Sequence, residues 1–193
     1  MPDKYVFPGG KTDRHDHRMF VAGDLRVEDA KRLALALGAR ATDSKARAIA
    51  LCAIRELQEE TGLSLGNDSH QTKNIAGWSA FHERGIAPNL STLRLIARAV
   101  TPPVYPHRYD THFFAAFCDQ SLNEAASNLA SSGELLEPGW FTFQQAKMLD
   151  LPQITRMILE EAELRIAVDP QLDRDLPIPC FLMRRGVMRR FTY

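Results

Sequence analysis

Arg55-Glu56-Leu57-Gln58-Glu59-Glu60-Thr61-Gly62-Leu63 is the stretch from which the fold and the chemistry of this chain are predicted. It closes a run that starts near Asp43 and contains no Pro or Gly before Gly62, so the run is expected to form one long helix ending at that glycine. At about 100° per residue, Glu56, Glu59 and Glu60 fall on one narrow face, while the apolar residues of the opposite face can be buried.

The acidic face has two interpretations. Three carboxylates this close repel one another, and a helix tolerates that cost more readily when a divalent cation lies among them. Oxygen ligands of this kind suit Mg²⁺ or Mn²⁺, which also bind water and substrate phosphate. The alternative is a solvated acidic surface, the common role of a run of charges. The glutamates alone leave both interpretations open.

A second feature lies near the start of the chain, at Phe7-Pro8-Gly9-Gly10-Lys11. Taken alone it is an ordinary Pro-Gly turn, although glycine also lets a backbone approach a ligand closely. This loop and residues 55–63, in this order, resemble the two parts of the Nudix box, whose second half reads R-E-U-x-E-E-x-G-U with U aliphatic. The chain is therefore similar to Nudix hydrolases, which cleave nucleoside diphosphates linked to another moiety with magnesium or manganese. The resemblance implies an α/β fold, an α/β/α sandwich with a mixed sheet, in a single domain over residues 1–193.

The chain departs from the family pattern between the two parts. In the family, G-x5-E-x7 leads directly into R-E, and counting back from Arg55 without a gap puts Arg47 and Ala41 at the Glu and Gly positions. Counting forward from Gly10 puts Asp16 at the Glu position and leaves a helical insertion at about residues 11–42. The second alignment is preferred because it accounts for the Pro-Gly-Gly-Lys loop, but the role of Asp16 stays open in it.

The resemblance assigns roles to the residues that match the box. Glu56, Glu59 and Glu60 are expected to hold the metal and to be catalytic. Arg55 is expected to orient a neighbouring glutamate by a charged hydrogen bond. The alternatives are a solvated acidic face and a surface arginine.

Substrate contacts are expected from the loop and from arginines further along the chain. The expected substrate-binding residues are Gly9, Gly10, Lys11, Arg94 and Arg108. Residues 93–101 alternate as a strand with Arg94 and Arg98 on one face, which either meets phosphates or is a solvated sheet face. Many Nudix enzymes carry a general base on a late loop, and Glu134 and Glu137 are the candidates, with a surface turn as the alternative for each.

The split box and residues 99–114 also resemble a branch of the superfamily associated with coenzyme A diphosphatase activity. Coenzyme A or acyl-coenzyme A is then the implied substrate, although ADP-ribose, dinucleotides and oxidised nucleotides satisfy the same chemistry. The alternative from another class is a Nudix-like ligand-binding or regulatory module without hydrolysis. Such modules are expected to lose the metal carboxylates, and all three are present here.

Composition bounds the class of protein. Lys+Arg and Asp+Glu both number 24, and this zero net charge argues against a nucleic-acid or membrane partner. The three cysteines form no C-x-x-C pair and are expected to be buried thiols in a reducing compartment. The start of the chain does not have the pattern of a signal peptide, so a cytoplasmic location is expected, and the resemblance allows a homodimer.

The remaining segments are predicted from periodicity and turn residues. Helices are expected at 27–37, 144–149 and 152–167, and strands at 5–7, 75–80, 93–101, 111–118 and 140–143. Residues 180–193 are expected to form a hairpin turning near Gly186, with Arg189 and Arg190 among its exposed arginines. His15-Asp16-His17 is either a metal-binding pair of histidines or, as the commoner case, a solvated loop.

Overall fold

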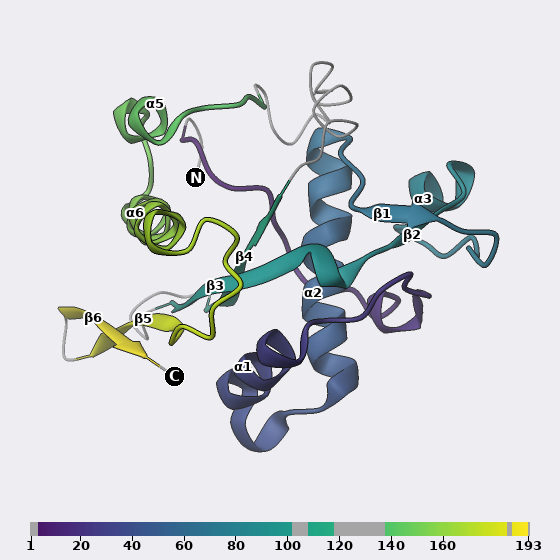
Figure 1. The fold of residues 1–193 in the computed structure, drawn as a ribbon, viewed down its shortest axis with the longest axis horizontal. Helices are drawn as coiled ribbons and strands as arrows, with labels where there is room; N and C mark the ends of the chain where they lie inside the picture. Colours follow the sequence, from purple (N-terminus) through teal and green to yellow (C-terminus); the bar gives the residue numbers. More distant parts are fainter. Residues whose placement is uncertain (1–3, 102–107, 118–137, 185–186, 193) are drawn as a thin grey trace. The chain divides into compact units, whose positions relative to one another are not determined.

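The computed structural model describes residues 4–101, 108–117, 138–184 and 187–192 (Figure 1). The chain divides into two compact units, which are described separately. Unit 1 comprises residues 1–7, 94–115 and 141–193, and unit 2 comprises residues 8–93 and 116–140. The expectation of a single domain over residues 1–193 stays a prediction beside this division.

In chain order the elements of unit 2 are η1 (Asp16–Arg18), α1 (Val27–Leu37), η2 (Gly38–Arg40), α2 (Asp43–Thr61), β1 (Gly66–Asp68), α3 (Ser79–Glu83), β2 (Ile86–Pro88) and η3 (Leu90–Thr92). Strand β3 (Leu93–Val100) begins with the last residue of this segment of unit 2, Leu93, and continues in unit 1. The elements of unit 1 that follow are β4 (Asp110–Ala116, which ends one residue beyond the unit), α5 (Phe143–Met148), α6 (Gln153–Val168), β5 (Pro179–Arg184) and β6 (Val187–Thr192).

Helix α2 is the long helix of unit 2, and its ends are set by local chemistry. The Thr42 side chain accepts a hydrogen bond from the Lys45 N–H at 3.2 Å, which satisfies one of the unpaired donors of the first turn. At the other end Gly62 adopts φ 78°, a left-handed conformation that glycine reaches without steric cost. Both boundaries coincide with the residues predicted from the sequence, as do those of α1.

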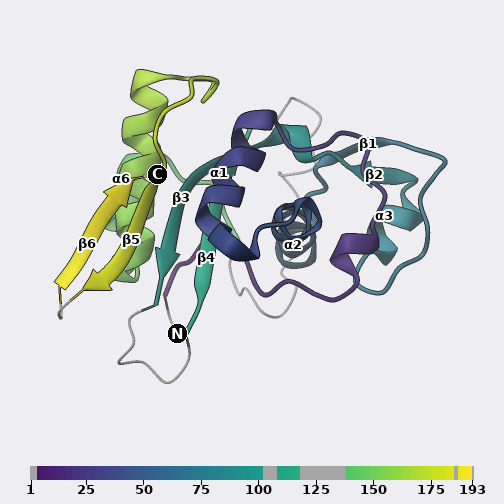
Figure 2. The same ribbon diagram turned by 90° about the horizontal axis from the view of Figure 1, so that it is seen from below.

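The other elements of unit 2 surround α2. Helix α1 packs against it, and the antiparallel pair β1–β2 with α3 lies on another side of it in both views (Figures 1 and 2). The buried core includes Leu33 of α1 and Leu51 and Ile54 of α2. Trp78 and Phe81 are fully buried, with ring centroids 5.1 Å apart. Burial of each such side chain is worth about 1.5–3 kcal/mol.

Unit 1 contains a mixed four-stranded sheet of order β4-β3-β5-β6. Strand β5 runs parallel to β3 and antiparallel to β6. Ile96 of β3, Ile158 of α6 and Phe181 of β5 belong to one buried cluster, so α6 packs on this sheet. The mixed sheet and the helices confirm the predicted α/β class, and residues 93–100 confirm the predicted strand with its buried face.

Three predicted strands are wrong. Residues 75–80 form a turn followed by α3, because Gly77 adopts φ 80°, which a regular strand does not contain, and the Trp78 N–H donates to the Ile75 carbonyl across the turn at 2.9 Å. Residues 140–142 lead into α5, since Thr142 and Gln145 form a capping box that begins a helix. Residues 5–7 are not in a strand, and the Tyr5 N–H donates instead to the Asp150 carbonyl at 3.1 Å.

Candidate active site

The Pro8-Gly9-Gly10 loop lies directly on the acidic face of α2. The Gly9 N–H donates to Glu60 Oε2 at 3.0 Å, which ties the loop to the last turn of the helix. Gly10 is so close to Glu56 that a Cβ atom there would be 2.3 Å from Glu56 Oε1. Any larger residue at position 10 would therefore displace the Glu56 carboxylate from where it stands. The two parts of the predicted box, separated by some forty residues in sequence, therefore meet in the fold.

Arg55 is the centre of the site. Its side chain is only 8% exposed, and its Nη1 donates to Glu56 Oε1 at 2.8 Å and to Glu59 Oε2 at 3.0 Å. Its Nη2 donates to the Lys11 carbonyl at 2.9 Å, so the arginine also fixes the backbone of the loop. One guanidinium thus orients two of the three candidate metal carboxylates, which is the kind of role that the resemblance implied for it.

Asp16 lies on the opposite edge of the Arg55 guanidinium and is fully buried. Its Oδ1 accepts from Arg55 Nε at 2.9 Å and from Trp78 Nε1 at 3.2 Å. Its Oδ2 accepts from the Asp13 N–H at 2.8 Å and from Arg55 Nη2 at 3.3 Å. With four donors this carboxylate is well satisfied despite its burial. The placement supports the alignment that puts Asp16 at the first acidic position of the box, where it holds Arg55 instead of reaching the face that carries Glu56, Glu59 and Glu60.

The electrostatics of the cluster follow from burial and from these contacts. Burial disfavours the charged form of Arg55, but the hydrogen bonds and negative charge of Asp16 outweigh it, and the pKa of the guanidinium is raised above its usual value. Desolvation raises the pKa of Glu59, with the charge of Glu56 acting in the same direction and Arg55 opposing both. Burial raises the pKa of the Cys52 thiol to about 12, so this thiol is held in its unreactive form beside Arg55.

A cavity of about 280 Å³ adjoins Arg55 and Glu59. Its other walls come from Asp13, Arg14 and His15 of the predicted insertion and from Ala76 and Gly77. The Asp13 carboxylate accepts a hydrogen bond from the His15 N–H, which lowers the pKa of Asp13. Carboxylates and cationic groups therefore line the same cavity, a combination suited to a phosphate and its counter-ion.

Sequence reasoning missed the part that residues 76–78 play here. Gly77 packs on the Arg55 side chain, and a Cβ atom there would be 3.1 Å from Arg55 Cδ. Trp78 supplies one of the four donors to Asp16. The Gly77-Trp78 pair is the available signal, since glycine commonly permits a turn, whereas the prediction of a strand at 75–80 passes over it.

The donor chemistry of the acidic face fits a hard divalent cation. Glu56, Glu59 and Glu60 offer only carboxylate oxygens, the ligands that Mg²⁺ and Mn²⁺ prefer. As the side chains stand, Glu56 and Glu59 are directed to Arg55 and Glu60 to Gly9. In the part of the chain that the structure describes, no three His, Cys, Asp or Glu side chains are grouped so as to hold a metal ion. Coordination would require rotation of these side chains, and Glu59, with a side chain 42% exposed, has the most room.

The other predicted site residues that the structure describes are arginines of unit 1. Arg94 forms an ion pair with Asp173 at 3.3 Å, and Arg98 pairs with Asp110, all within unit 1. Arg108 is exposed in the same unit. Substrate contacts by Arg94 and Arg108 stay predictions. The candidate bases Glu134 and Glu137 lie outside the described residues.

The histidines of His15-Asp16-His17 do not form a metal site with Asp16, whose oxygens are taken up by Arg55, Trp78 and Asp13. His15 lies instead 3.1 Å from Asp13, through its Nδ1 atom. The predicted solvated loop is thus closer to the structure than a metal site, although Asp16 and His17 lie in the 3₁₀ helix η1 and Asp16 is buried. Of the helices in the described ranges, none is long and apolar enough to cross a membrane.

Comparison with known proteins gives one informative match. The crystal structure of NUDIX hydrolase from Alicyclobacillus acidocaldarius covers 82% of this chain with 75% of its own, at 27% sequence identity and a TM-score of 0.55. No protein-family model matches the chain, and no curated protein matches it. The structural match supports the Nudix superfamily and a hydrolase of that type, with the fold that the sequence predicted. It does not bear on the coenzyme A branch.

Proposed function

We propose that this protein is a metal-dependent hydrolase that cleaves the pyrophosphate bond of a nucleoside diphosphate linked to another moiety. The observation that carries the proposal is the meeting of the glycine loop, Arg55 and the three glutamates of α2 at one place. The similarity to a Nudix hydrolase supports the same class of reaction. The products are two phosphomonoesters.

The proposed roles combine what the resemblance implies with the contacts of these residues. Glu56, Glu59 and Glu60 would hold Mg²⁺ or Mn²⁺. The chemistry supplied by the ion is charge compensation at the pyrophosphate and acidification of the attacking water. Arg55 positions Glu56 and Glu59 through Nη1, and Asp16 in turn holds Arg55. These contacts gather the carboxylates on one face of α2, and the rotation that coordination requires would exchange part of them for bonds to the metal.

The loop would contact the substrate. Gly9 and Gly10 present backbone close to the acidic face, and Lys11 has an exposed side chain whose charge complements a phosphate. Arg94 and Arg108 are proposed as further phosphate contacts, and Glu134 or Glu137 as the general base. Among substrates of this class we favour coenzyme A and acyl-coenzyme A, on the basis of the split box and residues 99–114.

The test is a hydrolysis screen of the full chain with Mg²⁺ or Mn²⁺ on coenzyme A, an acyl-coenzyme A, ADP-ribose, NADH and diadenosine polyphosphates. Products are identified by mass. Release of 3′,5′-ADP and 4′-phosphopantetheine from coenzyme A supports both the reaction and the substrate. Cleavage of another diphosphate keeps the reaction and removes coenzyme A as the substrate.

The second candidate is a ligand-binding module without hydrolysis. The observation that favours it is that Arg55 and the Gly9 amide bind the three carboxylates that catalysis needs for the metal. If no diphosphate is cleaved with either metal, yet one of them raises the melting temperature, this candidate replaces the hydrolase.

A further inference from the structure

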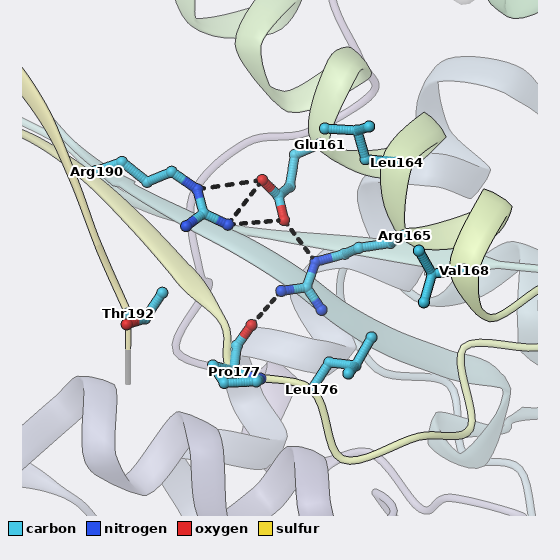
Figure 3. Close-up of a pocket in the computed structure, with 8 residues that line it drawn as sticks. All are labelled: Glu161, Leu164, Arg165, Val168, Leu176, Pro177, Arg190 and Thr192. Atoms are coloured by element: carbon cyan, nitrogen blue, oxygen red, sulfur yellow. Dashed lines mark hydrogen bonds and ion pairs between the residues drawn. The ribbon is translucent and has the colours of Figure 1, made fainter.

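A second pocket, of about 350 Å³, lies within unit 1 and shares no residue with the site on α2. Leu164 and Val168, one turn apart on α6, form one wall, and Leu176 and Pro177 of the segment after the helix form another (Figure 3). Leu164 and Val168 are 65% and 57% exposed. Apolar side chains exposed around a hollow are typical of a ligand site, and this volume is at the small end of the roughly 300–1,000 Å³ range.

A charged cluster adjoins these walls. The Glu161 carboxylate lies between the guanidinium groups of Arg165 and Arg190 (Figure 3). Arg165 donates from Nε to Glu161 Oε1 at 2.9 Å and from Nη2 to the Pro177 carbonyl, and both side chains of this pair are about nine-tenths buried. Arg190 of β6 donates from Nε and Nη2 to the two Glu161 oxygens at 3.1–3.3 Å. One negative and two positive charges leave the cluster with a net charge of +1.

The surplus charge is accessible at Arg190. Its side chain is 49% exposed, in contrast to Arg165 at 9%. Its Nε and Nη2 are used by Glu161, and among the described residues no acceptor is found for its Nη1. Because a guanidinium is rigid and planar, binding Glu161 through one edge leaves the N–H groups of Nη1 directed away from that carboxylate. An anion can therefore bind Arg190 without displacing Glu161.

We propose that this pocket binds a small amphipathic monoanion, a carboxylate attached to a short apolar body. The carboxylate accepts hydrogen bonds from Arg190 and neutralises the +1 charge of the cluster, while the apolar body covers Leu164, Val168 and Leu176. A single negative charge matches the surplus, and beside apolar walls an ion pair is screened less than in water. The proposal is independent of the proposed hydrolase activity.

The experiment is an NMR titration of the uniformly ¹⁵N-labelled full chain with hexanoate, with acetate and hexan-1-ol as controls. Hexanoate is expected to shift the amides of residues 161–192 saturably, with a Kd on the order of 1 mM. Acetate has the charge without the body and hexan-1-ol the body without the charge, so each is expected to bind at least tenfold more weakly. Equal binding of hexanoate and hexan-1-ol would overturn the role of the charge.

Two substitutions test the residues. Arg190→Gln is expected to weaken hexanoate binding at least tenfold, whereas Arg189→Gln, the same change at the next position of β6, should leave it within twofold because successive strand residues point to opposite faces. Leu164→Glu changes an exposed position that tolerates a polar residue. It should weaken hexanoate binding at least tenfold, because the new carboxylate at the pocket wall repels the carboxylate of hexanoate. Equal effects of the two arginine variants, or unchanged binding to Leu164→Glu, would refute the site. Inorganic phosphate binding as tightly as hexanoate in an Arg190-dependent manner would refute its preference for an amphipathic monoanion.

Discussion

The buried contact between Asp16 and Arg55 predicts that removing the Asp16 charge lowers the free energy of unfolding. Asp16→Asn keeps the size of the side chain but removes its charge and one of its two acceptor oxygens. The amide that replaces Oδ2 would face the Asp13 N–H and Arg55 Nη2, both of which are donors. The substitution therefore loses two hydrogen bonds and leaves the Arg55 charge less compensated in a buried place.

The size of the stability loss depends on the hydrogen-bond acceptors that Arg55 retains in the variant. Removing one partner of a buried ion pair costs about 3–5 kcal/mol. Arg55 keeps Glu56, Glu59 and the Lys11 carbonyl as acceptors at 2.8–3.0 Å, so the low end applies. We expect Asp16→Asn to lower the free energy of unfolding by about 3 kcal/mol. For a chain of this length that corresponds to a fall in Tm of roughly 6–12 °C.

The assay is urea unfolding at pH 7, followed by tryptophan fluorescence and circular dichroism. Asp24→Asn is the matched control, because Asp24 also pairs with an arginine, Arg47, at 3.3 Å, but both side chains are exposed. Such a surface pair is worth about 0–1 kcal/mol. In the double variant Asp16→Asn with Arg55→Leu, the uncompensated charge is gone, and a coupling free energy of about 2 kcal/mol is expected.

The reasoning would be refuted if Asp16→Asn and Asp24→Asn changed the free energy of unfolding by amounts within about 0.5 kcal/mol of each other. In that case the buried carboxylate would not be what compensates Arg55. A large loss of stability without coupling to Arg55 would also contradict it, since the effect would then come from Trp78 or the Asp13 backbone.

Three further predictions concern the glutamates, the loop and a buried histidine. Glu59→Gln should abolish most metal-dependent turnover with the Tm unchanged, a larger loss than the roughly 10–100-fold that an outer-shell partner costs. Gly10→Ala should lower the free energy of unfolding by about 1 kcal/mol and reduce turnover, because its Cβ would displace the flexible Glu56 carboxylate from Arg55, whereas Gly9→Ala meets nothing within 4 Å and should leave the free energy of unfolding unchanged. Burial lowers the pKa of His112 to about 4, so the free energy of unfolding falls as the pH drops from about 6.5 to 4, at up to about 1.4 kcal/mol per pH unit, because in that range the unfolded chain takes up a proton that the buried imidazole does not. His112→Asn should flatten that pH dependence in urea unfolding.

Each of these has a control. Glu83→Gln removes an exposed glutamate outside the acidic face and should leave turnover unchanged, and an unchanged rate in Glu59→Gln would remove that residue from the site. Equal changes in the free energy of unfolding of the two glycine variants would show that the close approach of Gly10 to Glu56 does not affect stability. The Nε2 of His112 is buried and finds no hydrogen-bond partner among the residues that the structure describes, and an identical pH dependence in wild type and variant would contradict burial as the cause.

The features that the sequence predicted correctly are those with local causes. The bounds of α2 follow from Thr42 at its start and Gly62 at its end, and residues within one turn of each boundary supply the hydrogen bonds. The strand at 93–100 was visible because alternation repeats every two residues along one segment. The strands β1 and β2 were missed because three residues are too few for a period, and they form only through pairing with each other.

The acidic face of α2, with Glu56, Glu59 and Glu60, was determined by the sequence alone, since helical geometry places residues i, i+3 and i+4 together wherever the helix lies. Only the tertiary structure decided what meets that face. Asp16 is 39 residues from Arg55 and 62 from Trp78, and their hydrogen bonds bury a carboxylate that the sequence could place only by counting. No local pattern reports such contacts, because the free energy that forms them comes from burial and pairing of residues far apart in the chain. The pairing of Glu161 with Arg190 is likewise a contact that no local pattern reports. Arg190 is predicted only to lie on an exposed hairpin, and in the tertiary structure it also lines a pocket.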